Sequence, residues 1–170
     1  MPIIVAFPPQ QAGSPLSKIL SDNGARQLHI AETEKYAHIT YFLNGGRENV
    51  FTNEDRILIP SPRVSSYSEK PEMSAPEIAS RLLAAIKSKT YEFIVVNFAN
   101  ADMVGHTGNL KAAIQAIETV DGLFKEIFEA VVQQDGVALM TADHGNAEMM
   151  FDPQTGEINK EHTANAVPII

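Results

Sequence analysis

Short apolar runs alternate along the chain with longer segments in which apolar residues recur at helical spacing. Apolar residues fill Val137–Met140 and, apart from Asn97, Phe93–Phe98, which predicts strands buried on both faces, as in a parallel sheet. Shorter strands are predicted at Gln27–Ala31 and Ile57–Ile59. Ala166–Ile170 has the composition of the start of one more strand. These runs indicate a sheet assembled from separate parts of the chain.

Helices are predicted between these strands. Ser14-Pro15 starts one helix, which ends at Gly24, and Thr33–Leu43 has the apolar spacing of another. A capping box, Ser74 to Glu77, begins a helix that runs to about Lys87. A long helix is predicted from Asn109 to near Gly136. The alternation predicts an α/β fold with a mostly parallel sheet flanked by helices.

The two ends of the chain have an unusual pattern. The chain begins in an apolar run, Pro2–Phe7, which predicts a strand, and it stops within Ala166–Ile170. Whole domains rarely begin and end inside buried strands. We therefore expect an incomplete domain that is truncated at both ends.

Composition excludes several classes of function. The 170 residues are 44% hydrophobic, enough for one sizeable core, and the net charge is −8 with no basic run. An acidic chain of this kind argues against a nucleic-acid partner. The absence of cysteine excludes disulfides and thiolate metal sites. No signal peptide or membrane-length apolar stretch is visible, so a cytoplasmic protein without a membrane partner is expected.

Carboxylates and histidines gather near the predicted strand ends. Asp102 and His106 follow Phe93–Phe98, while Asp143 and His144 follow Val137–Met140, and His162 precedes the last apolar run. Open α/β sheets place ligand sites at such strand ends, and this donor set suits Mn, Fe or Zn. Five donors suggest two metal ions. Taken singly, a histidine or aspartate in a loop is more often a helix cap or a solvated surface group. The placement of all five beside buried strands favours convergence, and spacing alone leaves both interpretations open.

Three other polar residues carry side chains that could take part in chemistry. His29 lies in a predicted strand and His38 in a predicted helix, and both are interpreted as structural. From the residues alone, Lys35 is better explained as a surface lysine than as a phosphate contact.

Six motifs in order along the chain closely resemble the cofactor-independent (2,3-bisphosphoglycerate-independent) phosphoglycerate mutases. The match covers almost the whole chain after Phe7, and the first and fourth motifs are the most specific. The motifs are Ala31–His38 (AETEKYAH), Phe42–Glu48 (FLNGGRE), Pro71–Pro76 (PEMSAP), Asn97–Gly108 (NFANADMVGHTG), Ala142–Glu148 (ADHGNAE) and His162–Pro168 (HTANAVP).

The resemblance implies an alkaline phosphatase-like fold in which the phosphatase domain is split by an inserted transferase domain. Residues 1–10 would form the exit strand or hinge from the transferase domain, and residues 11–170 the C-terminal part of the metal-binding phosphatase domain. The resemblance also implies that Lys35 binds the substrate phosphate. One Mn²⁺ would be bound by Asp102, His106 and His162, and a second by Asp143 and His144 with ligands from elsewhere.

The family interconverts 3-phosphoglycerate and 2-phosphoglycerate, a glycolytic reaction, through a phosphoserine intermediate. The resemblance implies two Mn²⁺ ions, with Mg²⁺ or Zn²⁺ as substitutes, no organic cofactor, and a monomer at full length. The nucleophilic serine is not among these residues, so the chain contains no catalytic residue of its own and is expected to be inactive alone.

Two alternatives remain open at the level of sequence. The first is a metal-dependent phosphatase or a phosphopentomutase-like enzyme, because the same superfamily shares the D-x-x-x-H and D-H-G elements. The second is a non-catalytic remnant that keeps the sheet without the chemistry. The AETEKYAH motif favours the glycerate mutase over the first alternative.

Overall fold

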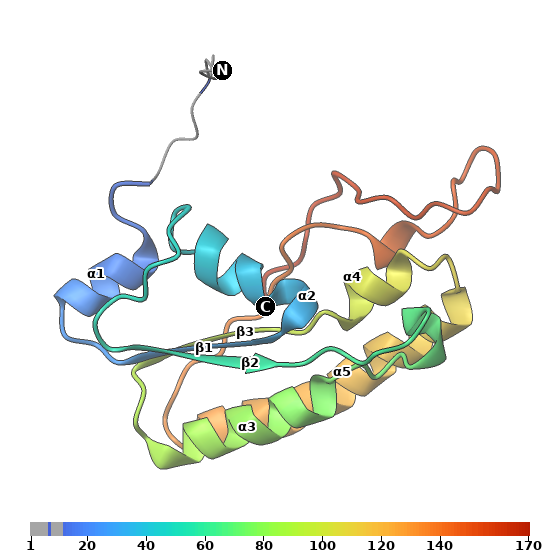
Figure 1. Ribbon diagram of the computed structural model, residues 1–170. Helices are drawn as coiled ribbons and strands as arrows, with labels where there is room; N and C mark the ends of the chain where they lie inside the picture. Colours follow the sequence, from blue (N-terminus) through green and yellow to red (C-terminus); the bar gives the residue numbers. More distant parts are fainter. Residues whose placement is uncertain (1–6, 8–11) are drawn as a thin grey trace.

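A three-stranded parallel sheet lies at the centre of the molecule (Figure 1). The computed structural model describes residue 7 and residues 12–170. Strand β1 (Gln27–Glu32) lies between β2 (Glu54–Ile59) and β3 (Phe93–Asn97). Ile30 of β1 is paired with Ile57 of β2 and with Val96 of β3. The carboxyl ends of all three strands therefore meet at one edge of the sheet.

Helices cover both faces of this sheet (Figure 1). Helices α3 (Ala75–Ser88) and α5 (Leu110–Val132) pack below it, while α1 (Leu16–Asp22) and α2 (Thr33–Ala37) lie above. The α/β class predicted from the sequence is confirmed. The remaining elements are the π-helical turn η1 (His38–Phe42), the short helix α4 (Asn100–Gly105) and the 3₁₀ turns η2 (Tyr67–Glu69) and η3 (Ala147–Met149).

The apolar core has two parts. Below the sheet, Ile30 and Ile59 pack with Ile78 of α3 and Ile127 of α5. The second part joins α4 to the first half of α5 through small and medium-sized side chains, which allow the two helices to approach closely. Its buried members are Met73, Ala99, Val104, Ala112, Ala113, Ala116 and Met150. This second cluster fixes α4 at the carboxyl edge of the sheet.

The most buried strand is β1, although the apolar run Phe93–Phe98 was predicted to be buried on both faces. All six residues of β1 are buried, whereas every residue of β3 is partly exposed. The physical reason is position, because β1 is paired on both sides and β3 only with β1. His29 of β1 is a core histidine, as expected, and its Nδ1 contacts the carbonyl of Ile39 at 2.5 Å.

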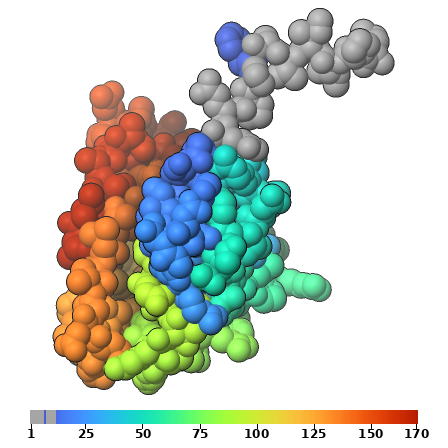
Figure 2. Space-filling model, turned by 90° about the vertical axis from the view of Figure 1, so that its left-hand side faces the viewer, coloured from blue at the N-terminus to red at the C-terminus, as the bar shows by residue number. Residues whose placement is uncertain are grey.

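The prediction of a strand at Val137–Met140 is wrong. Val137 and Leu139 are 94% and 74% exposed, and neither this segment nor Ala166–Ile170 belongs to the sheet. The two segments pair with each other instead, through reciprocal hydrogen bonds between the backbones of Met140 and Ile170 at 2.9 and 3.0 Å. With no neighbour in the sheet, their apolar side chains are uncovered. Figure 2 shows this part of the chain, in orange and red, along one flank.

Smaller differences concern the ends of elements. The helix predicted at Thr33–Leu43 is divided, since α2 passes into the π-helical turn η1. The predicted capping box is absent, because the Ser74 hydroxyl donates to the carbonyl of Pro60 at 2.7 Å instead of capping α3. The strand predicted for Pro2–Phe7 lies outside the described residues except for Phe7. Over residues 12–170, each helix is too short or too polar to cross a bilayer.

Candidate metal centre

Helix α4 places two candidate ligands on one face. It begins just after β3, where the side-chain amide of Asn100 donates to the carbonyl of Pro71 at 2.8 Å. Asp102 and His106 are four residues apart, so both point to the same side of the helix. The Nε2 of His106 lies 3.0 Å from Oδ1 of Asp102.

His162 joins this pair from a loop far along the sequence. Its Nε2 lies 3.1 Å from Oδ1 of Asp102 and 3.0 Å from Nε2 of His106. One ligand atom from each of the three residues falls within 4.8 Å of the others. The three residues therefore form a compact set of donor atoms.

The donor chemistry of this set fits a divalent cation. Nδ1 of His106 contacts the carbonyl of Lys160 at 2.5 Å, so in neutral imidazole the proton is assigned to Nδ1 and a lone pair to Nε2. Oδ1 of Asp102 is buried and makes no hydrogen bond with any residue that the structure describes. Electron pairs that face one another in this way repel, and a cation between them removes the repulsion. A carboxylate with two imidazoles is a donor set for Mn, Fe, Co or Zn.

The other candidate ligands adjoin the first three. Asp143 and His144 lie in the loop before η3, with His144 Nε2 at 3.7 Å from Oδ2 of Asp143. The ring of His144 stacks on that of His162, with centroids 3.7 Å apart. All five residues singled out from the sequence as ligands thus form one cluster at the carboxyl edge of the sheet.

Lys35 lies between the two aspartates. Its ammonium group is 2.8 Å from Oδ2 of Asp102 and 3.0 Å from Oδ2 of Asp143. Lys35 is only 2% exposed, so the interpretation of this residue as a surface lysine is wrong. Helix α2 turns its side chain inward directly after β1, a placement that the residue types around it did not indicate.

The positive charge of Lys35 lowers the pKa of both carboxyl groups. Burial on its own would raise the pKa of Asp102 and of Asp143, because it disfavours the charged form. The hydrogen bond and positive charge of Lys35 are the largest of the effects that lower the pKa, and together these effects outweigh burial, so the pKa of each carboxyl lies below its ordinary value. Both aspartates are therefore ionised at neutral pH, as metal ligands must be.

The sequence-based search for site residues missed the contacts that connect the two ligand-bearing loops. Glu148 accepts hydrogen bonds from the Thr163 hydroxyl and from the backbone of Asn146, and the N–H of Thr163 donates to the carbonyl of Gly145 at 2.9 Å. Glu148 and Asn146 share the A-D-H-G-N-A-E motif with two of the ligands. That proximity was the one signal that could have identified them.

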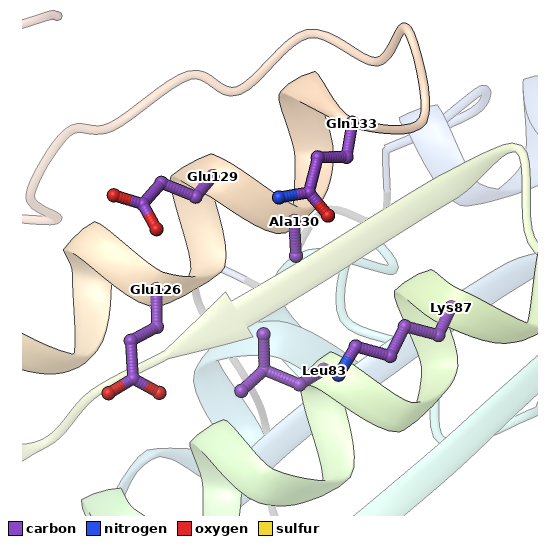
Figure 3. Close-up of a pocket in the computed structure, with 6 residues that line it drawn as sticks. All are labelled: Leu83, Lys87, Glu126, Glu129, Ala130 and Gln133. Atoms are coloured by element: carbon purple, nitrogen blue, oxygen red, sulfur yellow. The ribbon is translucent and has the colours of Figure 1, made fainter.

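A shallow hollow of about 160 Å³ lies elsewhere, between the last turns of α3 and α5 (Figure 3). Leu83 and Lys87 line it from α3, facing Glu126 and Glu129 of α5. Both helices run from the carboxyl edge of the sheet toward the opposite end, so this hollow is remote from the metal cluster. We assign the chemistry to the cluster, which has converging donor atoms.

An α/β domain with this cluster at the carboxyl ends of parallel strands has the architecture of a metal-dependent enzyme. The chain belongs to the metalloenzyme superfamily, whose family model matches residues 6–170. It is 57% identical over 168 residues to the 2,3-bisphosphoglycerate-independent phosphoglycerate mutase of Chloroflexus aurantiacus, covering 99% of this chain and 31% of that protein. The mutase of Thiobacillus denitrificans is 56% identical, with 99% and 33% covered. The resemblance inferred from the motifs is thereby confirmed.

A solved structure agrees with the sequence relatives. Phosphoglycerate mutase from Leishmania mexicana, studied at low cobalt concentration, superposes with a TM-score of 0.83 and 37% sequence identity. The superposition covers 88% of this chain and 30% of that one. The chain therefore spans about a third of the length of the relatives it matches, and its fold is that of the corresponding part of the mutase.

Proposed function

We propose that this chain forms part of a 2,3-bisphosphoglycerate-independent phosphoglycerate mutase, which interconverts 3-phosphoglycerate and 2-phosphoglycerate. The observation that carries the proposal is the convergence of Asp102, His106, His162, Asp143 and His144 on one point beside Lys35. The identity to mutases over 99% of the chain supports the same conclusion. The parts of the enzyme that bind the glycerate and supply the nucleophilic serine are proposed to lie outside these residues.

In this proposal the cluster holds two Mn²⁺ ions. Asp102, His106 and His162 hold one, while Asp143 and His144 contribute to the second together with ligands from elsewhere in the enzyme. When bound, such ions lower the pKa of an attacking hydroxyl and neutralise charge on a transferring phosphoryl group. The reaction then proceeds through a phosphoserine intermediate, in the cytoplasm, as a step of glycolysis.

The residues of this chain have distinct tasks in that reaction. The Asp102 carboxylate and the imidazoles of His106 and His162 orient the first ion, and the carbonyl of Lys160 holds the His106 ring in one tautomer. Two carboxylates hold the ammonium group of Lys35 in position, and Lys35 is proposed to bind the phosphate of the substrate.

A chimeric enzyme tests the proposal. The matching 168 residues of the Chloroflexus aurantiacus mutase are replaced by this chain, and conversion of 3-phosphoglycerate to 2-phosphoglycerate is measured with added Mn²⁺. We expect mutase activity in the chimera, none in its Asp102→Ala variant, and none in the 170-residue chain alone. A folded, metal-loaded chimera that acts on other phosphate esters but not on phosphoglycerates would contradict the proposal.

A further inference from the structure

Glu148 is an exposed carboxylate that closes the loop carrying Asp143 and His144. It lies in the 3₁₀ turn η3, four residues after His144. Its Oε2 accepts a hydrogen bond from the backbone N–H of Asn146 at 2.6 Å. Asn146 itself is buried, and its side chain fills the space beside Gly105 of α4. One oxygen of Glu148 thus holds, through a hydrogen bond, the loop that lies against α4.

The other oxygen reaches the loop that carries His162. Oε1 of Glu148 accepts hydrogen bonds from the hydroxyl of Thr163, the residue next to His162, and from the side-chain amide of Asn165 at 2.9 Å. The two loops also meet through their backbones at Gly145 and Thr163. Glu148 is therefore bonded to both ligand-bearing loops, and its hydrogen bonds with described residues go to Asn146, Thr163 and Asn165 rather than to a proposed ligand.

These contacts matter because the loops have little regular structure to hold them. Residues 157–165 contain neither helix nor strand, so the position of His162 depends on isolated bridges and side-chain bonds. Hydrogen bonds to an ionised carboxylate are stronger than those between neutral groups. The hydrogen bond from Thr163, with those from Asn165 and the backbone, keeps the pKa of Glu148 below its ordinary value. The carboxylate is therefore charged at neutral pH.

The space between the loops is filled. A Cβ added to Gly145 would lie 2.2 Å from the Thr163 hydroxyl oxygen and 2.4 Å from Oε1 of Glu148. The glycine thus allows the carboxylate to sit directly between the two loops. Removing the carboxylate would open this junction, because Glu148 is the one residue among 143–165 whose side chain bonds to both Asn146 and Thr163.

We propose that Glu148 is a positioning residue that sets the distance between His162 and the Asp143–His144 pair, and through it the geometry of the bound metal. The inference rests on the proposed function, because it assigns to Glu148 a task within the metal centre. Glu148 acts through Thr163 and Asn146, in the way that residues behind metal ligands commonly hold those ligands in place.

Metal titration of the 170-residue chain tests this role. Mn²⁺ binding is measured by calorimetry for the wild type, Glu148→Ala, Glu148→Gln and the control Glu157→Ala. The control removes an exposed glutamate whose side chain makes no hydrogen bond or ion pair with the residues that the structure describes. We expect Glu148→Ala to weaken Mn²⁺ binding about 10- to 100-fold, the usual effect of removing such a partner. Glu148→Gln should weaken it less, since its amide oxygen still accepts from Thr163 and Asn165. The control should match the wild type.

A spectroscopic measurement separates positioning from a general loss of stability. With Co²⁺ at saturation, the visible absorption reports coordination geometry, and we expect Glu148→Ala to alter the band positions while Glu157→Ala leaves them unchanged. If Glu148→Ala does not fold, Thr163→Val serves in its place, since it removes one of the three hydrogen bonds. We expect this variant also to weaken Mn²⁺ binding and to shift the Co²⁺ bands.

The outcomes distinguish the inference from the proposed function. Wild-type Mn²⁺ affinity and unchanged Co²⁺ bands in Glu148→Ala, or in Thr163→Val where that variant replaces it, would overturn the positioning role and leave the metal centre intact. A wild-type chain that binds neither Mn²⁺ nor Co²⁺ would overturn the proposed centre, and the role of Glu148 with it.

Discussion

The buried charge of Lys35 has a direct consequence for stability. Its ammonium group neutralises Asp102 and Asp143, which lie 2.8 and 3.0 Å away. Lys35→Met leaves two neighbouring carboxylates without their shared cation. We expect the free energy of unfolding of the metal-free chain to fall by about 3 kcal/mol, the lower end for breaking a buried ion pair, because Asp143 is partly exposed to solvent. Urea unfolding in the presence of a chelator measures the change.

Lys125→Met is the matched control, because Lys125 is exposed on α5 and forms no ion pair with the described part of the chain. This variant should unfold within about 0.5 kcal/mol of the wild type, as surface substitutions usually do. Saturating Mn²⁺ should reduce the deficit of Lys35→Met, since a bound cation replaces the lost positive charge. Equal stability of Lys35→Met and wild type without metal would show that the ion pairs contribute nothing.

His29 makes the stability of the chain depend on pH. Burial lowers the pKa of His29 from its ordinary value of 6.5, outweighing the carbonyl of Ile39 and the charge of Glu54. The unfolded chain therefore binds this proton more readily, so the contribution is fully present above about pH 6.5 and declines as pH falls toward the folded-state pKa. We expect His29→Gln to flatten the decline between pH 7 and 5 in urea unfolding of the metal-free chain. An unchanged slope would exclude His29 as the cause.

Residue types in the sequence predicted which groups would gather, but not how they would be held. Asp102, His106 and Asp143 could be connected because each follows an apolar run or a predicted strand. The burial of Lys35 could not be predicted, since a lysine after Thr33-Glu34 has the pattern of a surface helix. Glu148 was missed because its partners, Thr163 and Asn165, lie more than ten residues away, and no local pattern records such contacts.

At the level of elements, the fit of α4 against the loop at Asn146 determines whether the ligands meet. A Cβ on Gly105 would lie 1.9 Å from Oδ1 of Asn146, which is buried and cannot easily move away. We expect Gly105→Ala to push α4 and this loop apart, to lower stability by about 1–3 kcal/mol, as overpacking does, and to weaken Mn²⁺ binding. Thermal unfolding and calorimetric titration measure the two effects.

Gly122→Ala on α5 is the control, and it should raise stability where Gly105→Ala lowers it. Gly122 lies within the helix and has open space where a Cβ would be. Alanine there should raise the free energy of unfolding by about 0.5–1 kcal/mol, because glycine loses more backbone entropy in a helix. Metal affinity should not change. If Gly105→Ala also stabilised the chain, the close approach of α4 to Asn146 would not be tight enough to exclude a Cβ at residue 105.

Apolar runs predicted the existence of most elements but not their burial. The long helix α5 and strand β3 lie close to their predicted positions, because periodicity over many residues gives a strong signal. The burial of strand β1 could not be predicted from its apolar pattern, because the polar residues Gln27 and His29 interrupt that pattern. Both are nevertheless buried beneath α1 and η1. For Val137–Met140 the apolar pattern predicted a buried strand, whereas the segment is largely exposed and lies outside the sheet. An apolar β-like segment becomes a strand only where a neighbouring strand offers its backbone, and sequence alone does not identify that neighbour.

At the scale of the whole molecule, the proposed assignment gives this chain a complete set of ligands for one metal ion and part of the set for a second. Asp102, His106 and His162 provide three donors within 4.8 Å of one another, all from residues of this chain. Asp143 and His144 offer two donors, and Lys35 places a positive charge beside them. Because two donors next to a cation bind a metal weakly, we expect the 170-residue chain to bind one Mn²⁺ tightly in calorimetric titration.

Variants assign that ion to a set of ligands. Asp102→Ala should abolish tight binding, because the carboxylate is the only anionic donor of the complete set, whereas Asp143→Ala should leave a stoichiometry of one. The chimeric mutase should bind two ions, since the remaining ligands of the second set would then be present. Two tight sites in the isolated chain would mean that Asp143 and His144 suffice for the second ion. Loss of binding in Asp143→Ala, with Asp102→Ala unaffected, would reverse the assignment of the two sets.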